Sequence, residues 1–295
     1  MLQQTRVAAV IEHYHEFLRR FPTVQKLAAA RASSVLAAWS GLGYYRRARM
    51  MHAAAKVIVR NREGKFPTTS GGWRELPGIG RYTAAAIASI AFGEAVAVVD
   101  GNVERVLQRF TGQPLGGEEL WQAAEDSLDP MRPGDFNQAM MELGATVCTP
   151  RTPACLMCPV VELCATRGEL AGTAKPARQK KREIHYTLQC RLNGHGQEVF
   201  LVQRLPDASL MAGMWELPEI SRPGDHVTPA FTVRHSITVT DYTVRVWRAS
   251  APEKIQGQWV RLDRLKKLAL TGLARKILRR SEMAAAENSQ IHHSR

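Results

Sequence analysis

Hydrophobic residues in the first 165 positions recur at intervals of three and four, which is the spacing of amphipathic helices. The segment 6–20 follows it with Val7, Val10, Ile11, Tyr14 and Leu18, which would share one helical face. Further helices are predicted over 44–61, 82–92, 103–110, 118–128 and 136–147. Another is expected to run through Trp39, with Ser33 or Ser34 as its N-cap. The pattern predicts a mainly α domain over residues 1–165.

Beyond residue 165 the hydrophobic pattern changes to period two, which is typical of β-strands. The change follows residues 166–183, a segment with several Lys and Arg and almost no large apolar side chains, which predicts a basic linker. Strands are predicted over 185–192, 198–203 and 243–247, and a closing helix over 262–280. Residues 184–280 therefore predict a second, smaller α+β domain, and the tail 281–295 is expected to be disordered.

The composition narrows the class of protein. Hydrophobic residues make up 45% of the 295 positions, which excludes a chain that is disordered throughout. Lys and Arg number 40 against 27 Asp and Glu, a net charge of +13, and such a balance attracts polyanions such as nucleic acid. A generally basic, solubilising surface is the alternative. No apolar run approaches the ~18 residues of a membrane helix, so we expect a cytoplasmic protein without a membrane partner.

Four of the five cysteines lie close together in the sequence: Cys148, Cys155, Cys158 and Cys164. In a reducing compartment such a cluster is more typical of a metal site than of disulfides. Four thiolates at this spacing suit either tetrahedral zinc or a [4Fe–4S] cluster, although the spacing is that of neither a zinc ribbon nor a ferredoxin. Buried, unligated cysteines are the remaining alternative.

Two further segments carry candidate chemistry. Gly78 and Gly80 flank one apolar residue in a turn between two predicted helices, where backbone amides can bind a phosphate oxygen. Asp100 follows an apolar run and precedes a Gly-Asn pair. That position suits a helix N-cap, and it also suits a carboxylate that stabilises a developing cation or acts as a base or nucleophile.

These motifs, in this order, resemble those of the helix-hairpin-helix DNA glycosylases. They are Leu2-Gln3-Gln4-Thr5, Gly41-Leu42-Gly43-Tyr44-Tyr45, Leu76-Pro77-Gly78-Ile79-Gly80, Asp100-Gly101-Asn102 and the four cysteines. Within that superfamily, residues 1–165 are similar to the branch that removes adenine mispaired with 8-oxoguanine or guanine. Residues 184–280 resemble, more weakly, the Nudix-like C-terminal domain of the same branch.

The resemblance implies roles for the matching residues. Asp100 would be the catalytic aspartate that stabilises an oxocarbenium-like sugar, with Asn102 as its hydrogen-bonding partner. Tyr82 stands where strand-cutting relatives such as endonuclease III carry a Schiff-base lysine, so the chain would be a monofunctional glycosylase. The implied DNA contacts are Gln3, Gln4, Thr5, Leu42, Tyr44, Gly78, Gly80 and Gln138.

Several of these contacts would have distinct tasks. Gln138 would read the edge of the flipped adenine, while Gln4 and Tyr44 would wedge into the base stack; Thr5 and Leu42 would lie near the oxidised guanine. Without the resemblance, a core aromatic is the preferred interpretation of Tyr44. The resemblance also implies a [4Fe–4S] cluster in residues 148–164, double-stranded DNA as the partner, a monomer, and a place at the bacterial nucleoid.

The sequence departs from the family pattern in the second domain. The run Gly213–Pro218 is not followed by the acidic residues with which a Nudix hydrolase holds magnesium, so this domain is expected to recognise the lesion rather than to hydrolyse a pyrophosphate. The run Arg234–Val239 occupies the region of the family's Phe-Ser-His motif, so the histidine contact to 8-oxoguanine is absent or displaced.

A second departure is at the front of the chain. The sequence starts at the family's methionine, after the family's general-acid glutamate, and Glu12 and Glu16 lie too far beyond the first motif to replace it. We therefore expect excision to be impaired. Two other functions stay open: an endonuclease III-like oxidised-pyrimidine glycosylase/lyase, against which Tyr82 argues, and a DNA-binding protein without chemistry.

Overall fold

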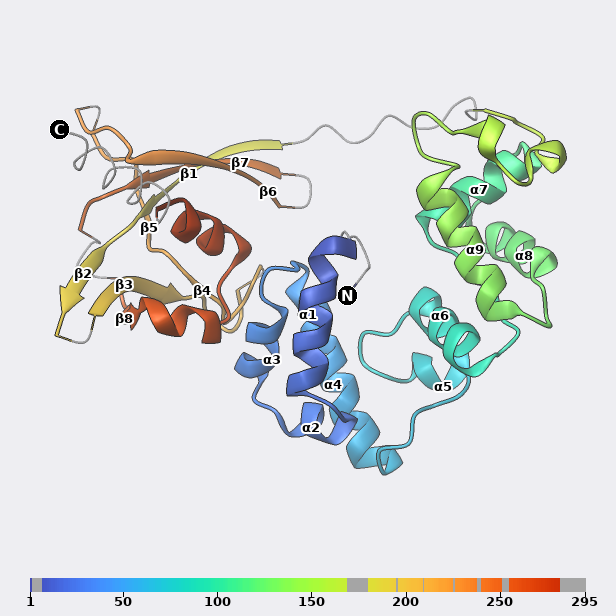
Figure 1. Ribbon diagram of the computed structural model, residues 1–295, viewed down its shortest axis with the longest axis horizontal. Coiled ribbons are helices and arrows are strands. Elements are labelled where there is room, and N and C mark those ends of the chain that lie inside the picture. The colour runs from blue at the N-terminus through green and yellow to red at the C-terminus, as the bar shows by residue number, and fades with distance from the viewer. Residues whose placement is uncertain are drawn as a thin grey trace. The chain divides into compact units, whose positions relative to one another are not determined.

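The computed structural model describes residues 1, 7–168, 180–194, 196–208, 210–224, 226–237, 240–250 and 255–281 (Figure 1). The chain forms two compact units, Met1–Lys56 together with Pro176–Arg295, and Val57–Lys175. These units do not coincide with the expected segments 1–165 and 184–280, because the first helices share a hydrophobic core with the C-terminal part. Within the described part of the chain, no helix combines the length and apolar character that crossing a membrane requires.

The first unit opens with helices α1 (Val7–Arg20), α2 (Val24–Ala29), α3 (Ala32–Trp39) and α4 (Tyr45–Arg62), of which α4 continues into the second unit. Phe17 of α1 packs against Phe21, directly after that helix, and against Trp39 at the end of α3. Met214 and Ala269, which lie far away in the sequence, belong to the same core. Residues near the start of the chain and near its end therefore stabilise each other.

The residues expected to share one face of α1 differ in burial. Val10 is buried, whereas four others form an exposed stripe: Val7, Ile11, Tyr14 and Leu18. The N-cap expectation for α3 is wrong: the helix begins at Ala32 with Arg31 as the cap residue, so Ser33 and Ser34 lie inside its first turn.

The C-terminal part of the first unit consists of strands β1 (Lys180–Thr187), β2 (Cys190–Asn193), β3 (Gly196–Gln203), β4 (Trp215–Glu216), β5 (Glu219–Ile220), β6 (Phe231–Ile237), β7 (Thr240–Trp247) and β8 (Gln258–Arg261). One sheet has the order β5-β1-β7-β6, with β1 and β7 parallel. The other has the order β2-β3-β4, with β8 paired to β3. Leu201, Val244 and Ile277, which come from both sheets and the helix over 272–281, share one core.

Three expectations for this part are corrected. Residues 180–183 belong to β1 rather than to a linker, and the strand expected over 185–192 is divided between β1 and β2. The helix expected over 262–280 is a 3₁₀ helix, η3 (Leu262–Lys267), and then a helix over 272–281. It is interrupted because Trp215 exchanges backbone hydrogen bonds with Ala269 and Thr271, both at 2.9 Å. Most of the expected linker, 169–179, and the tail 282–295 lie outside the described residues.

The second unit contains α5 (Ser70–Arg74), α6 (Arg81–Phe92), α7 (Gly101–Thr111), α8 (Gly117–Ser127), α9 (Pro133–Thr146), and the 3₁₀ turns η1 (Cys155–Met157) and η2 (Val161–Leu163). Helix α9 packs against both α6 and α7. A Cβ on Gly134 would lie 2.8 Å from the carbonyl oxygen of Ser89, and one on Gly144 would lie 2.6 Å from the Cβ of Asn102. Glycine at these two positions lets α9 approach both neighbours closely.

Replacing Gly144 with Ala is expected to destabilise the second unit by about 1–3 kcal/mol, because the added methyl overlaps Asn102. Gly71→Ala is the matched control, since an added Cβ there, in helix α5, meets nothing within 4 Å. Alanine at Gly71 should be neutral or mildly stabilising. Urea unfolding followed by circular dichroism measures both variants, and equal midpoints would contradict the close approach of α9.

Candidate functional site

Asp100 occupies the N-cap of α7, as one of its two sequence interpretations predicts. Its Oδ1 accepts hydrogen bonds from the backbone amides of Asn102 and Val103, both at 2.8 Å. Its Oδ2 accepts a longer one, 3.2 Å, from the side-chain amide of Asn102. The residue is half-buried. The helix therefore fixes one carboxylate oxygen firmly and leaves the other the more available for a ligand.

The segment that leads to Asp100 is held by Asn137 of α9, a side chain that is only 2% exposed. Its Oδ1 accepts from the amide of Val98 at 3.1 Å, and its Nδ2 donates to the carbonyl oxygen of Val96 at 2.9 Å. The same nitrogen donates to Ser89 Oγ of α6 at 3.0 Å. A buried side-chain amide with all these partners fixes the backbone strongly, because breaking the set would leave polar groups unpaired.

Arg105 connects Asn102 to the segment that carries the cysteines. Its Nη2 donates to Asn102 Oδ1 at 2.8 Å and to the carbonyl oxygen of Gly144 at 2.5 Å. Its Nε donates to the carbonyl oxygen of Cys148 at 2.8 Å. Because Asn102 Oδ1 accepts from Arg105, its Nδ2 faces Asp100, so Arg105 sets the orientation of the amide at the site.

Helix α9 also gathers two of the other predicted residues. The Tyr82 hydroxyl donates to the sulfur of Met141 at 3.7 Å. Gln138 lies one turn earlier on α9, is exposed, and donates from Nε2 to the carbonyl oxygen of Gly134 at 3.1 Å. Since Gly144 lies against Asn102 one turn later, Tyr82, Asn102 and Gln138 are distributed along one side of a single helix.

The turn between α5 and α6 contains Gly78 and Gly80, the two glycines predicted to form an anion-binding turn. Gly78 has φ of +75° and Gly80 is the N-cap of α6, with no side chain to accept from the first amides of that helix. Both glycines are exposed or nearly so. Arg81 follows Gly80, and its Nη1 donates to Glu118 Oε1 at 2.7 Å. The Cζ atom of its guanidinium lies 3.9 Å from the centroid of the Trp121 ring. The turn offers backbone amides at a helix N-terminus, which is a binding place for an anion.

The four clustered cysteines line one pocket, together with Arg109 and Arg167. None of the four forms a disulfide with another described cysteine. Among the described residues, no three His, Cys, Asp or Glu side chains are arranged to hold a metal ion. The sequence thus brings the cysteines to one place, but the structure does not show a coordination geometry.

Arg109 supplies the test of whether this pocket fits an anionic group. It is 4% exposed, and its guanidinium donates to the carbonyl oxygens of Thr149 and Pro150 and, at 3.3 Å, to Cys148 Sγ. Its Nε is buried and has no hydrogen-bond partner among the described residues. A buried cation held by neutral carbonyls and thiols lacks a compensating charge. Cysteines ligated as thiolates would provide that charge, so the donor set fits a metal or a cluster.

The remaining predicted DNA contacts belong to residues 1–56 of the first unit. Tyr44 is 47% exposed, has φ of +48°, and lies under the Arg47 guanidinium at 4.8 Å. The core aromatic of this motif is its neighbour Tyr45, so a core role for Tyr44 is wrong. Leu42 is 5% exposed and belongs to the core. Gln3, Gln4 and Thr5 lie outside the described residues.

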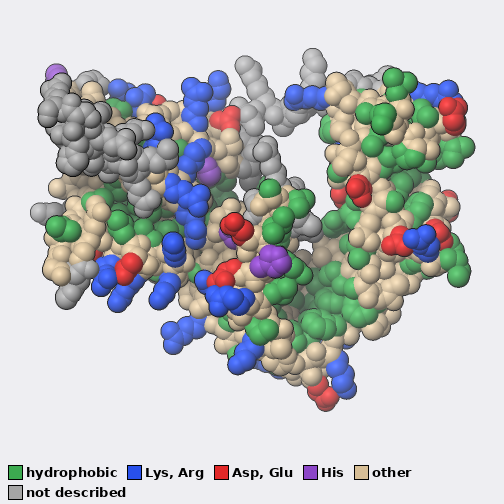
Figure 2. Space-filling model, in the orientation of Figure 1, with side chains coloured by type: hydrophobic (Ala, Val, Ile, Leu, Met, Phe, Trp, Pro, Cys, Tyr) green, Lys and Arg blue, Asp and Glu red, His purple; other side chains and the backbone are tan. Residues whose placement is uncertain are grey.

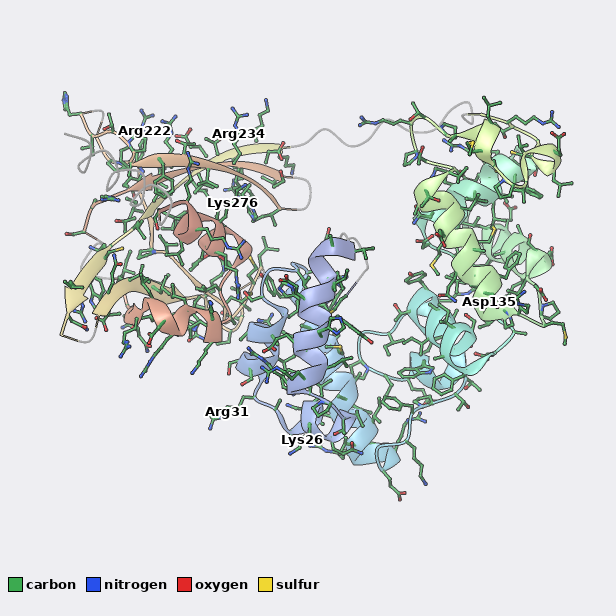
Figure 3. All side chains as sticks on the ribbon, in the orientation of Figure 1. Lys26, Arg31, Asp135, Arg222, Arg234 and Lys276 are labelled. Carbon is green, nitrogen blue, oxygen red and sulfur yellow. The ribbon has the colours of Figure 1, made fainter. Side chains whose placement is uncertain are left out.

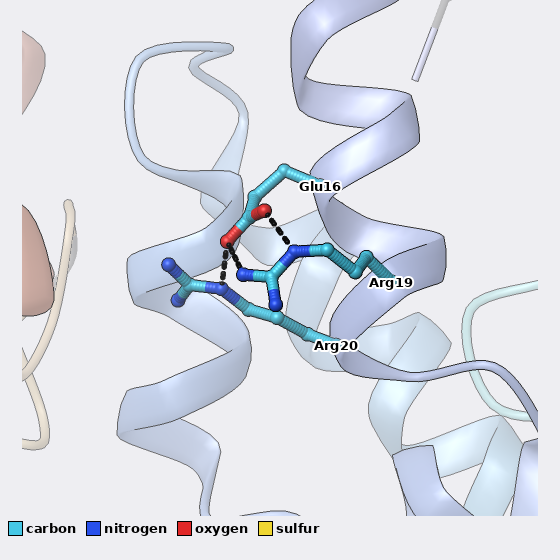
Figure 4. Close-up of polar contacts among 3 residues, drawn as sticks. All are labelled: Glu16, Arg19 and Arg20. Atoms are coloured by element: carbon cyan, nitrogen blue, oxygen red, sulfur yellow. Dashed lines mark hydrogen bonds and ion pairs between the residues drawn. The ribbon is translucent and has the colours of Figure 1, made fainter.

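Glu16 of α1 is an ion-paired carboxylate (Figure 4). Arg19 donates to both of its oxygens at 2.8 Å, and Arg20 donates to one at 2.5 Å. These hydrogen bonds lower the pKa of Glu16 to about 2. Glu16 therefore carries no proton at neutral pH and cannot act as a general acid.

In the C-terminal part, Glu216 of the Gly213–Pro218 run is buried and accepts from Arg204 at 2.7 and 3.0 Å. Residues 234–239, which occupy the region of the family's Phe-Ser-His motif, form the end of strand β6 as far as Ile237. The next two residues lie outside the described ones.

On the face that Figure 2 shows, Lys and Arg side chains gather over the C-terminal part of the first unit. Figure 3 shows Lys26 and Arg31 directed outward from α2 and from the start of α3.

Sequence reasoning did not single out Asn137, Arg105 or Arg109. No sequence signal distinguishes Asn137 from its polar neighbour Gln138. Most partners of the two arginines are backbone carbonyls of residues 101–150, which no pattern of side chains reveals.

The sequence of the chain is similar to those of known DNA repair proteins. The profile of the HhH-GPD superfamily base excision DNA repair proteins matches residues 1–120. Adenine DNA glycosylase of Homo sapiens is 40% identical over 275 residues, covering 75% of this chain and 50% of that protein. Its counterpart in Mus musculus is 41% identical over 273 residues, covering 75% and 53%. The chain thus spans about half the length of the curated relatives it matches.

Among solved structures, a thermostable thymine-DNA glycosylase superposes with a TM-score of 0.53 and 29% identity, over 56% of this chain and 79% of that one. The matched family profile begins with the first helices and includes the glycine turn and the Asp100 cap. Residues 1–120 therefore match the HhH-GPD superfamily of base excision DNA repair proteins, and the chain is similar to the adenine DNA glycosylases.

Proposed function

We propose that the chain is a monofunctional adenine DNA glycosylase that acts on adenine paired with 8-oxoguanine or guanine in double-stranded DNA, as a monomer. The observation that carries the proposal is Asp100, whose position is fixed by two amides and whose Oδ2 is bound only by Asn102 among the hydrogen bonds of the described residues. A carboxylate held in this way stabilises a cationic sugar without having to reorganise.

Tyr82 supports the monofunctional part of the proposal. A lyase needs an amine that attacks the sugar carbon to form a Schiff base, and a phenol cannot do so. The hydroxyl of Tyr82 is engaged with the sulfur of Met141. On a duplex containing A:8-oxoguanine, the protein should give strand breaks slowly after alkali treatment and none before it. Breaks without alkali would favour the endonuclease III-like function, and no breaks at all would favour a DNA-binding protein.

DNA binding is proposed to combine contacts to phosphates and contacts to bases. The exposed turn at Gly78 and Gly80 would bind a phosphate through amides at the start of α6, without reading sequence. Tyr44, exposed and held in a strained conformation, would insert into the base stack. Gln138 offers an amide that suits the donor and acceptor edge of adenine. The net charge of +13 favours a polyanion.

The C-terminal part, residues 184–280, is proposed to be a Nudix-like element that recognises the lesion. A hydrolase would need free acidic groups to hold magnesium, whereas Glu216 is occupied by Arg204. Its arginines and lysines, including Arg222 and Arg234 in Figure 3, are suited to the phosphates around the mispair.

Cys148, Cys155, Cys158 and Cys164 are proposed to hold a [4Fe–4S] cluster. When bound, such a cluster cross-links the segment 148–164 and contributes negative charge. Arg109 would then have a charge to pair with, and the carbonyls of Thr149 and Pro150 would orient its guanidinium.

Asp100→Asn is expected to abolish the preference for a cationic sugar while leaving DNA affinity intact, because the variant keeps the shape and the capping ability of the residue. The measurement compares binding to a duplex with a cationic pyrrolidine in place of the nucleotide against one with a neutral tetrahydrofuran. The preference for the pyrrolidine should fall roughly 10- to 100-fold, as for a lost charge-assisted contact. An unchanged preference would mean that Asp100 is a helix cap alone.

Cys158→Ser is expected to remove iron and sulfide from the anaerobically purified protein, because three thiolates hold the cluster poorly. Cys190→Ser is the control, since Cys190 is exposed and lies outside the pocket. Chemical analysis of iron and sulfide, with the absorption spectrum, measures both variants. Stoichiometric zinc without iron in the unchanged protein would contradict the cluster and support the zinc site.

A further inference from the structure

The loop between α3 and α4 is held in a conformation that most residues avoid. Gly41, Gly43 and Tyr44 have φ of +113°, +72° and +48°. The two glycines adopt these angles freely, but Tyr44 is strained because its Cβ crowds the neighbouring carbonyl. Such a conformation persists only where the surrounding structure fixes it.

Contacts within the first helices provide part of this restraint. The indole Nε1 of Trp39 donates to the carbonyl oxygen of Gly43 at 3.0 Å. The side chain of Leu42 is anchored in the core, which leaves Tyr44 outside. The amide of Gly41 donates to the hydroxyl oxygen of Tyr45 at 3.4 Å. The two ends of the loop are thus tied to residues on either side of it.

The second part of the restraint comes from the C-terminal part of the same unit. Ser40, which is 1% exposed, donates from Oγ to the carbonyl oxygen of Leu270 at 2.6 Å. Arg275 donates from Nε to Ser40 Oγ at 2.8 Å. The Tyr45 hydroxyl donates to the same Leu270 carbonyl at 3.5 Å. One line of hydrogen bonds therefore joins Arg275, Ser40, Leu270, Tyr45 and the amide of Gly41.

The Leu270 carbonyl is itself fixed. Leu270 pairs with Trp215 in a parallel bridge, and the neighbouring Ala269 and Thr271 exchange backbone hydrogen bonds with Trp215. Ala269 and Met214 are buried in the same core as Trp39. Arg275 is half-buried beside Ser40, and this burial lowers the pKa of its guanidinium. This end of the hydrogen-bonded line is a rigid support.

We propose that Arg275 is a positioning residue, which acts through Ser40 and the Leu270 carbonyl to hold the Gly41–Tyr44 loop and thereby presents Tyr44 to DNA. Arg275 does not itself contact DNA in this arrangement. The final step, insertion of Tyr44 into the duplex, rests on the proposed function. The restraint of the loop does not, and it can be measured in the free protein.

The first measurement is hydrogen exchange of the full chain without DNA, followed by mass spectrometry over residues 40–45. Arg275→Met keeps the aliphatic stem and removes the hydrogen bond, so exchange in this segment should be about fivefold faster. Arg280→Met is the matched control, because Arg280 is an exposed arginine on the same helix. Ser40→Ala should accelerate exchange as Arg275→Met does, and the double variant should add nothing further.

The second measurement uses a duplex with 2-aminopurine beside the mispair, whose fluorescence rises when the base unstacks. Tyr44→Ala should abolish the rise. Arg275→Met should reduce the fluorescence rise about threefold relative to Arg280→Met, a variant with the same net charge. When Tyr44 is already replaced with Ala, adding Arg275→Met should cause no further loss. Circular dichroism checks that each variant is folded, and Ser40→Ala replaces Arg275→Met if the latter is not.

The two measurements separate the two claims. Equal exchange in Arg275→Met and Arg280→Met, or full exchange protection in Ser40→Ala, would overturn the positioning role. Faster exchange together with an unchanged fluorescence rise in Tyr44→Ala would support the restraint and overturn the insertion of Tyr44 in the proposed function.

Discussion

The arrangement of the second unit depends on one buried amide, the side chain of Asn137. It is the point at which α9, α6 and the extended segment 96–98 are joined by hydrogen bonds. That segment continues directly into Asp100 and the start of α7. The packing of α9 therefore determines the position of the Asp100 carboxylate. Gly134 and Gly144 allow the packing, because any side chain at either position would push α9 away from Asn102 or Ser89. The position of the Asp100 carboxylate therefore depends on helix packing rather than on the conformation of a loop.

A comparable constraint governs the first unit, but it joins residues from opposite ends of the sequence. Trp39, Met214 and Ala269 share one core, and Ser40 is hydrogen-bonded to Leu270 and Arg275. Removal of residues 184–280 would expose this core and release the loop at Tyr44, so a truncated chain would lose more than the proposed lesion-recognition element. Point substitutions on the surface of the C-terminal part separate recognition from folding, whereas deletion cannot.

How much the sequence predicts differs between residues 1–165 and the C-terminal part for physical reasons. The helices predicted in 1–165 are confirmed with ends displaced by three residues or fewer, because their periodicity is a local signal. The break in the predicted helix over 262–280 depends on pairing with Trp215, about fifty residues away, and local periodicity cannot show it. At the site, the N-cap role of Asp100 was visible in the Gly-Asn pair that follows. The orientation of Asn102 was not, because it depends on Arg105 and on the carbonyl oxygens of distant turns.

The carboxyl groups of the described residues divide the proposed reaction into a part that these residues supply and a part that they do not. A general acid at neutral pH needs a raised pKa, which comes from burial without a cation. Glu16 is in the opposite environment, bound by two arginines. Among the described carboxyl groups, the pKa of Glu216 is the one that burial raises, yet this group is bound by Arg204 inside the C-terminal part. Asp100 accepts hydrogen bonds from two amides, so its role is that of an anion. The described residues therefore provide charge stabilisation for the sugar, and the proton for the leaving adenine has to come from water or from a group outside them.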